Sequence, residues 1–440
     1  MRSSNRSRSI AALVAAGALA FGCFSATAAS ATDDRSGAGG PGRHHPHASA
    51  DHVVLLALDG FDIDYLDRAP MPNLAHLLKR GSLTTSTGVM TSITNPSWAS
   101  IATGAWPEHH LNTAFWYDEE AGVARGSSRD IAVPTIAEAI RDQGGTVASA
   151  QWFIVQDHGT SYGDPEALYT QPGGTCERRV DDGVAVLTGK PVLSQGVEVT
   201  VPKIPDLTAV YCDTLDAIGH DGGAEDPRIP GALQMIDEQI GRLVQAAKDA
   251  GIYGRTTFVI TGDHGMTTFT NGFGAEVLAA IADAGYQAEI LSANQSPAAD
   301  TDVVLTLGGV ADVHLIGDAE NDPDAAARIT AAVEGLPYIH AVYDKEAQQA
   351  MHMSPKHGEL LIEPAPGWSW STPSDGVSGR HGSTTEMEVP LILAGAGVRP
   401  NAKPVAPRHI DVAPTIAALL GYDAPAAAEG RVLKEAIRVR

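Results

Sequence analysis

Acidic and imidazole residues recur in pairs along this chain, each beside a glycine or close to one. Two are pairs of an acid and an imidazole, Asp216 with His220 and Asp263-His264. Two more are a single acid or imidazole followed by glycine, Asp59-Gly60 and His381-Gly382. Carboxylates and neutral imidazoles are both competent ligands for zinc-like divalent cations. A single pair is weak evidence, because a core hydrogen bond or a surface turn explains it equally well. Several pairs at the ends of predicted strands favour one shared metal site.

A hydroxyl suited to attack phosphorus lies in the segment from Thr91 to Gly104. Pro96 fits the first turn of a helix, and Asn95 before it is a good N-cap residue. Thr94 would then precede a helix N-terminus, where free N–H groups and the helix dipole favour an anion such as phosphate. A hydroxyl beside Asn-Pro is more often only a cap. Together with the Asp and His pairs, however, Thr94 becomes a candidate nucleophile.

Predicted strands position these residues. Val53–Leu58 is a continuous apolar run of the kind found in buried parallel strands, and Leu207–Tyr211 and Thr256–Ile260 are predicted strands as well. Open α/β sheets bind ligands at the carboxyl ends of their strands. The pattern therefore predicts an α/β fold, with a mostly parallel sheet flanked by helices and the site at that edge.

The remaining pattern predicts the domain organisation. We expect a signal peptide (1–31), a disordered linker (32–51), a catalytic core (52–270 and 377–440) and a smaller α+β cap insertion (271–376). Residues 159–205 are poorly patterned and are expected to form a long loop. Four further residues are expected to be bystanders: His352, Lys356 and His357 on the surface, and His409 as a structural residue. Asp411 is expected to be structural too, as the N-cap of a final helix.

The N-terminus predicts export. Arginines at positions 2, 6 and 8 precede an apolar run from Ile10 to Phe24, and cleavage is expected after Ala31. That run is too short to span a membrane, and no later segment is predicted to do so. The residues before Cys23 fit a lipoprotein anchor poorly, so we expect a secreted product. Export favours a disulfide between the two remaining cysteines, Cys176 and Cys212.

The chain is strongly acidic, with a formal net charge of −23. An acidic surface disfavours nucleic-acid polymers and anionic membranes as partners. A small anionic substrate would need positive charge inside its binding site, which bound cations would supply. The sequence predicts no oligomeric state.

The motifs occur in the order found in the alkaline phosphatase superfamily, and the chain most resembles its type I phosphodiesterase/nucleotide pyrophosphatase family. The resemblance spans residues 53–432 and includes the sequence around Thr103-Gly104 and Gly430-Arg431. It implies an alkaline-phosphatase-like core that binds two divalent metal ions, expected to be Zn²⁺. By motif, one ion would be held by Asp216, His220 and His381, and the other by Asp59, Asp263, His264 and the Thr94 oxygen.

The same resemblance implies an exported phosphoesterase that cleaves phosphodiester or pyrophosphate bonds in small anionic phosphoesters. Two cations about 3.5–4 Å apart can clamp the attacking and leaving oxygens of an in-line displacement. Thr94 would form a phospho-threonine intermediate, which water then hydrolyses.

The sequence of the nucleophile segment differs from the motif usual in this family. Nucleotide pyrophosphatases usually read Thr-Phe-Pro-Asn-His, whereas this chain reads Thr94-Asn95-Pro96-Ser97-Trp98. Asn95, Ser97 or backbone N–H groups are therefore the expected phosphate contacts. Asn95 resembles the text of phosphonoacetate hydrolases, so a C–P hydrolase stays open as an alternative, and so does a phosphomonoesterase.

Two further questions stay open. Arg380 is a candidate contact to the leaving group, and Trp98, Trp116 and Trp152 are either a stacking surface or core aromatics.

A sulfatase is disfavoured, because the nucleophile segment has neither the convertible Cys or Ser nor the Arg that this class needs. A non-catalytic metal-binding module is a lesser alternative, because neither the nucleophile nor any motif ligand is missing.

Overall fold

The computed structural model describes residues 48–438. The predicted signal peptide, its cleavage site and most of the predicted linker lie outside the described residues. Ser49, Ala50 and Asp51, at the end of that linker, are held in the fold by hydrogen bonds from their amides to the carbonyls of Leu419 and Arg255. Within residues 48–438, no helix is both long enough and apolar enough to cross a membrane.

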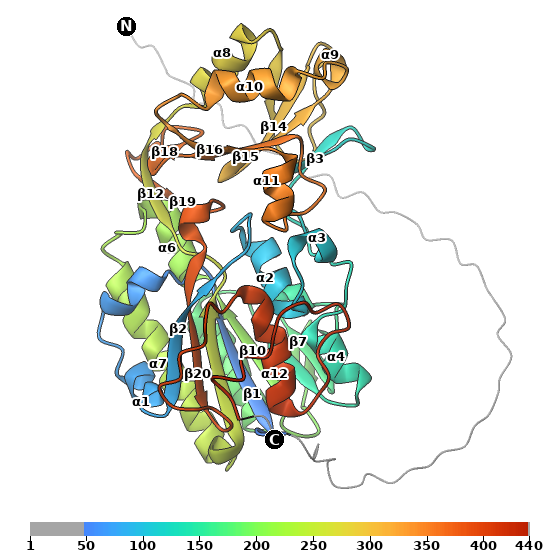
Figure 1. Ribbon diagram of the computed structural model, residues 1–440. Helices are drawn as coiled ribbons and strands as arrows, with labels where there is room; N and C mark the ends of the chain where they lie inside the picture. Colours follow the sequence, from blue (N-terminus) through green and yellow to red (C-terminus); the bar gives the residue numbers. More distant parts are fainter. Residues whose placement is uncertain (1–47, 439–440) are drawn as a thin grey trace, which may run out of the picture. The chain divides into compact units, whose positions relative to one another are not determined.

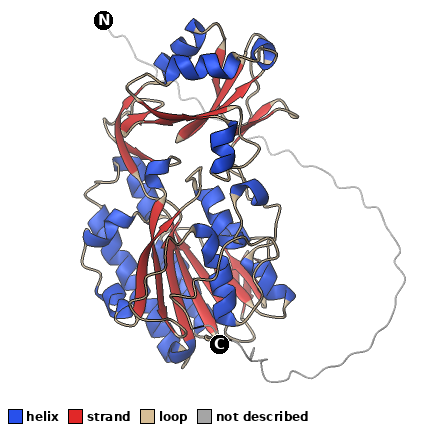
Figure 2. Ribbon diagram, viewed as in Figure 1, coloured by secondary structure: helices blue, strands red, loops and turns tan. Residues whose placement is uncertain are grey.

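An eight-stranded mixed sheet forms the centre of the fold (Figure 2). Its strands, in spatial order, are β2 (Gly81–Thr87), β20 (Glu388–Gly395), β11 (Thr256–Gly262), β1 (His52–Leu58), β10 (Leu207–Cys212), β5 (Val147–Ala150), β7 (Ala167–Thr170) and β6 (Ser161–Tyr162). All are mutually parallel except β20, which is antiparallel to both of its neighbours. The mostly parallel sheet predicted from the sequence is confirmed.

Helices cover both faces of this sheet (Figure 1). One face packs against α2 (Thr94–Thr103), α4 (Ile136–Asp142) and α12 (Val412–Leu420). The other packs against α1 (Pro72–Leu78), α5 (Cys176–Leu187) and α7 (Ile229–Asp249). Because β1 is buried on both sides, its continuous apolar sequence follows directly from its place in the sheet.

The register brings the ends of three strands to one level. Leu58, the last residue of β1, lies opposite Cys212 of β10 and Gly262 of β11. The residues that follow these strands therefore leave the sheet together at its carboxyl edge. The site residues predicted on β1 and β11 sit at this edge.

Residues beyond β11 build further sheets. A five-stranded sheet contains β13 (Ala288–Leu291), β14 (Val303–Gly308), β15 (Val310–Leu315), β17 (Leu360–Pro364) and β16 (Ile339–Tyr343). It shares a hydrophobic core with α8 (Gly274–Asp283) and α10 (Ala325–Val333), and two short helices, α9 (Gly317–Glu320) and α11 (Lys345–Ala350), complete this region. A three-stranded sheet combines β18 (Gly367–Ser369), β12 (Thr267–Gly272) and β19 (Ser378–Arg380). The limits of the cap, 271 and 376, stay a prediction.

The long loop expected over residues 159–205 is wrong. This stretch contains β6, β7, the twelve-residue helix α5 and a hairpin of β8 (Val192–Ser194) and β9 (Val197–Val199). Helix α5 opens with Cys176, which forms a disulfide with Cys212 at the end of β10. The predicted bridge is therefore present, and it joins α5 to the edge of the sheet where the site lies.

Two further predictions concern single residues. Asp411 lies at the N-cap position of α12, as predicted, although its side chain accepts from the amides of Arg408 and Arg431 rather than from an amide of the helix. His357, expected on the surface, is buried and contacts the buried carboxylate of Asp312 at 3.2 Å. His409 is fully buried, as expected for a structural residue.

Candidate active site

Asp59 and Asp216 are brought together by the close approach of two backbone segments. Asp59 directly follows β1, and Asp216 lies in the first turn of α6 (Thr214–Gly222). The amide of Asp216 donates a hydrogen bond to the Asp59 carbonyl at 3.2 Å. Gly60 between them has φ +68°, and a Cβ there would lie 2.8 Å from the Cα of Asp216. Only glycine fits this approach without displacing one of the two carboxylates.

Thr94 is the first residue of α2, and Ile93 takes the N-cap position. The prediction that Asn95 is the N-cap is therefore wrong, because the helix begins two residues earlier than that cap requires. Asn95 lies in the first turn, and its Nδ2 donates to the carbonyl of Ser128 at 2.5 Å. The Thr94 Oγ1 lies 3.1 Å from Nε2 of His264, which places the hydroxyl among the predicted metal ligands.

One group of ligand atoms consists of Asp216, His220 and His381. Oδ1 of Asp216 lies 3.3 Å from Nε2 of His220 and 3.5 Å from Nε2 of His381. The two Nε2 atoms are 3.1 Å apart. His220 lies one helical turn after Asp216 on α6, as the four-residue spacing predicts.

A second group consists of Asp59, Asp216 and His264, with ligand atoms within 4.8 Å of one another. Nε2 of His264 is 3.3 Å from Oδ1 of Asp59 and 3.4 Å from Oδ2 of Asp263. Asp263 therefore touches this group through His264, while Asp216 belongs to both groups. The two predicted ligand sets form one continuous cluster rather than two separate ones.

Backbone carbonyls fix the orientation of all three histidines. Nδ1 of His220 lies 3.1 Å from the Gly379 carbonyl, Nδ1 of His264 lies 2.9 Å from that of Gly265, and Nδ1 of His381 lies 3.0 Å from that of Ser92. A carbonyl oxygen only accepts, so each Nδ1 carries a proton. In the neutral ring, each Nε2 then points a lone pair at the cluster, which is the arrangement of metal-binding histidines.

The carboxylates supply the matching negative charge. Oδ1 of Asp59, Oδ1 of Asp216 and Oδ2 of Asp263 are buried and accept no hydrogen bond from the described residues. Burial, with the neighbouring carboxylates, raises the pKa of Asp59 and Asp263. Burial lowers the pKa of His264, but Asp263 and Asp59 outweigh it and raise that pKa to about 10. These atoms together favour a positive charge between them, as a divalent cation would provide.

The cluster opens into a cavity of about 520 Å³. Its walls include Thr94 and four of the predicted ligands, Asp59, Asp216, His220 and His381, together with Ile93, Asn95, Phe115, Phe153, Tyr211, Asp213, Gly308 and Arg380. Among residues 48–438, Arg380 is the only arginine or lysine in the lining, and its guanidinium is bonded to other groups. Its guanidinium donates to the carbonyls of Trp368 and Pro364 and to the Ser383 hydroxyl, and lies 3.5 Å from Glu386. No free arginine or lysine among the described residues therefore faces this cavity.

Some sequence predictions find no support in this geometry. Ser97 is fully buried inside α2 and does not line the cavity, so its role as a phosphate contact is not carried forward. Trp98 and Trp152 are core residues packed edge to face. Tyr211 lines the cavity and touches Asp59, and sequence reasoning missed it. The available signal was its place at the end of a predicted strand, five residues before Asp216.

Comparisons with known proteins identify the family of this chain and proteins of similar fold. Residues 53–384 match the family described as type I phosphodiesterase/nucleotide pyrophosphatase. The chain is 26% identical over 400 residues to a bis(5'-adenosyl)-triphosphatase of Xenopus laevis, covering 86% of this chain and 80% of that protein. The human bis(5'-adenosyl)-triphosphatase is 28% identical over 229 residues, but this match covers only 47% of its length.

Solved structures of similar fold point the same way. Murine ectonucleotide pyrophosphatase/phosphodiesterase 5, solved as an inactive threonine-to-alanine variant in complex with AMP, aligns with a TM-score of 0.66 and 20% identity over 85% of this chain and 96% of that one. The human protein of the same name aligns with a TM-score of 0.65 and 21% identity, with the same coverage. These likenesses show the fold. On the match over residues 53–384, the chain belongs to the type I phosphodiesterase/nucleotide pyrophosphatase family of hydrolases.

Proposed function

We propose that this chain is an exported two-metal hydrolase that cleaves phosphodiester or pyrophosphate bonds in small nucleotide-like substrates, with Thr94 as nucleophile. One observation carries the proposal. The Thr94 hydroxyl lies at the N-terminus of α2, 3.1 Å from Nε2 of His264, beside buried carboxylates that accept no hydrogen bond on one oxygen each. The hydroxyl, the anion-binding helix end and the cation ligands meet at one place.

The ligand atoms fit divalent cations, because the Nε2 atoms of rings that carry a proton on Nδ1 face carboxylate oxygens that accept no hydrogen bond from the described residues. Asp216, His220 and His381 would hold one ion, and Asp59, Asp263, His264 and Thr94 the other. When bound, such ions lower the pKa of a ligated hydroxyl and offset the charge of phosphate oxygens. With mixed Asp and His ligands, we expect Zn²⁺.

Thr94 acts on phosphorus in two steps. In the first, the Thr94 oxygen forms a bond to phosphorus as the bond to the leaving oxygen breaks, which gives phospho-Thr94 and the first product. In the second, water attacks the same phosphorus and releases Thr94 and phosphate monoester. The free N–H groups of Thr94 and Asn95 in the first turn of α2 suit the phosphate oxygens, because a helix N-terminus binds anions.

Aromatic side chains suit a flat group on the substrate. Phe115, Phe153 and Tyr211 line the cavity, and its volume lies in the range of small-molecule sites. A nucleobase is such a group, and the similar murine protein is in complex with AMP. These three residues, rather than the core residues Trp98 and Trp152, are therefore the candidates for stacking.

Export is supported by the disulfide. A bridge such as Cys176–Cys212 forms and persists in oxidising compartments outside the cytoplasm. The bridge agrees with the N-terminal sequence pattern, which lies outside the described residues.

Specific contacts argue against two of the three alternative functions. The C–P hydrolase rested on Asn95, whose amide is bonded to Ser128 rather than free for a substrate carboxylate. The non-catalytic module is disfavoured, because the nucleophile and all the predicted ligands meet in one cluster. A phosphomonoesterase differs only in what surrounds the metals, so substrate comparison must separate it.

The test compares Thr94→Ala with Thr85→Ala, an exposed threonine on β2. We expect Thr94→Ala to lose turnover of a nitrophenyl phosphodiester while it keeps most of its metal by elemental analysis, and Thr85→Ala to match the wild type. Wild-type rates on the diester, a phosphomonoester and phosphonoacetate rank the three reactions. Excess chelator should abolish hydrolysis and Zn²⁺ should restore it. Full activity of Thr94→Ala would reject its role as nucleophile.

A further inference from the structure

Tyr211 is a cavity residue whose hydroxyl is already engaged. In the register of β10 and β1 it lies opposite Ala57, two residues before Asp59. Side chains two positions apart along a strand share a face, so Tyr211 lies on the side toward which Asp59 points. The Tyr211 hydroxyl donates a hydrogen bond to Oδ2 of Asp59. The small side chain of Ala57 leaves room for this reach.

This hydrogen bond gives the two oxygens of Asp59 different surroundings. Oδ2 is bonded to Tyr211, whereas Oδ1 accepts no hydrogen bond from residues 48–438 and lies 3.3 Å from Nε2 of His264. Asp59 is only 2% exposed, so solvent does not hold either oxygen in place. Without the Tyr211 hydroxyl, the carboxylate could rotate and present either oxygen to the cluster.

The ring of Tyr211 is held on three sides. Trp98 and Phe153 meet it edge to face, with ring centroids at 6.1 Å and 5.3 Å. The guanidinium carbon of Arg179 lies 5.4 Å from its centroid. Arg179 is 3% exposed, so this cation–π contact is shielded from water.

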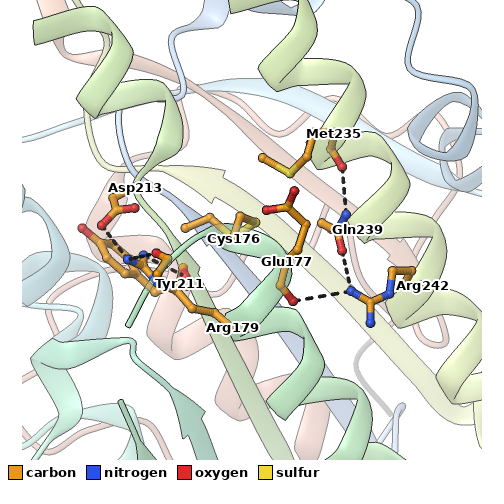
Figure 3. The surroundings of a disulfide bond; sticks show 10 residues. Cys176, Glu177, Arg179, Tyr211, Asp213, Met235, Gln239 and Arg242 are labelled. Atoms are coloured by element: carbon orange, nitrogen blue, oxygen red, sulfur yellow. Dashed lines mark hydrogen bonds and ion pairs between the residues drawn. A yellow bond between two sulfur atoms is a disulfide. The ribbon is translucent and has the colours of Figure 1, made fainter. Parts of the chain in front are cut away.

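Arg179 and the disulfide together attach α5 to the end of β10 (Figure 3). Cys176, the first residue of α5, is bonded to Cys212, and Arg179 follows one turn later. The Arg179 guanidinium donates to the Tyr211 carbonyl at 3.4 Å and to Oδ2 of Asp213 at 2.8 Å. The residues on either side of Cys212 are thus bound by one side chain, and Cys212 itself by a covalent bond.

We propose that Tyr211 is a positioning residue that keeps Oδ2 of Asp59 occupied and so presents Oδ1 to the cation, and that the Cys176–Cys212 disulfide holds Arg179 where it fixes Tyr211. The inference rests on the proposed function, because it takes Asp59 as a metal ligand. Groups that orient a ligand typically change metal affinity or activity by roughly 10- to 100-fold when removed.

The first experiment removes one oxygen atom with Tyr211→Phe, which keeps the ring and its three contacts. We expect the EDTA concentration that removes half of the bound zinc to fall by roughly 10-fold or more. We also expect kcat to fall while KM changes little, because the ring still lines the cavity. The control is Tyr169→Phe, a fully buried tyrosine on β7 whose hydroxyl bonds Gln171 at 3.3 Å and which does not line the cavity.

The second experiment replaces both cysteines by alanine, alone and together with Tyr211→Phe. If the disulfide acts through Tyr211, the combined variant retains zinc as Tyr211→Phe does, because the two changes remove the same restraint and their effects are not additive. Should the cysteine variant fail to fold, Arg179→Gln takes its place in the same comparison.

Each result decides one part of the proposal. Zinc retention and kcat equal to the wild type in Tyr211→Phe would overturn the positioning role, as would a raised KM alone, since that marks only a wall contact. Fully additive losses would overturn the link to the disulfide. A wild-type protein that binds no zinc would overturn the proposed function and this inference together, whereas zinc-loaded, active wild type with an unaffected Tyr211→Phe overturns the inference only.

Discussion

His110 gives the fold a specific sensitivity to acid. It is fully buried beneath α2, in the four-residue helix α3 (Pro107–His110). Its Nδ1 accepts from the Asn112 amide at 3.0 Å, and its Nε2 donates to the Ser100 hydroxyl at 2.9 Å. Because the Asn112 amide only donates, Nδ1 must stay unprotonated for this bond to exist. A second proton on the ring would break the bond and place an unpaired charge in the core.

Burial lowers the pKa of His110 from its ordinary 6.5 to about 3. The folded-state pKa is depressed, so the stabilising contribution of neutral His110 is present above pH 6.5 and is lost as pH falls toward 3. From these two pKa values the loss between pH 7 and pH 5 is about 2 kcal/mol, and its limit at lower pH is roughly 4–5 kcal/mol. This is a sizeable fraction of the stability of a typical domain.

The perturbation is His110→Asn, whose side-chain oxygen can still accept from the Asn112 amide but which does not titrate. We expect the variant to be less stable at pH 7, because the bond to Ser100 is lost and a cavity remains. Between pH 7 and pH 5, however, its free energy of unfolding should fall by about 2 kcal/mol less than that of the wild type. Urea unfolding of both proteins at pH 7, 6 and 5, in excess chelator so that metal release does not contribute, measures this difference. Equal pH dependence in the two proteins would refute the argument.

Two predictions concern the site itself. Gly60→Ala should lower kcat by roughly 10-fold or more, because the added Cβ would lie 2.8 Å from the Cα of Asp216. Gly163→Ala is the control, since Gly163 has a similar φ of +78° but no atom near the added Cβ, and equal activity losses in the two variants would contradict the steric reason. His381→Ala should reduce bound zinc toward one ion per chain, which elemental analysis measures, and an unchanged zinc content would remove His381 from the ligand set.

The fold could be predicted where strands are buried on both faces. Val53–Leu58 is apolar throughout because helices cover both sides of β1, and the carboxyl end of such a strand is a known location for ligands. The sequence does not predict the elements within residues 159–205, because α5 begins with a run of charged residues, Glu177 to Arg179, and contains Gly183, while its contacts with β10 and the disulfide appear only in the fold. The predicted N-cap, Asn95, lies two residues after the observed N-cap, Ile93, since the cap position depends on backbone geometry that the Asn-Pro pair does not fix.

The site could be predicted only as a set of residue types. Motif spacing indicated Asp59, Asp216, Asp263 and their histidines, but it did not show that Asp216 belongs to both groups of ligand atoms. The position of Ser97 in the motif predicts a phosphate contact, but α2 directs its side chain into the core. The sequence around His357 does not indicate its burial, because its partner, Asp312, lies 45 residues earlier in the chain.

The contacts that orient the histidines of this candidate metal site come from residues outside the motifs. The Nδ1 atoms of His220 and His381 are held by the carbonyls of Gly379 and Ser92, which lie 159 and 289 residues away in the sequence. A carbonyl has no side-chain identity, so no residue pattern records this role. If either segment shifted, the ring could turn and aim its other nitrogen at the cluster, and every motif would still be present. The ability of this chain to bind metal therefore depends on the folding of the segments around β19 and before α2 as much as on the ligands themselves.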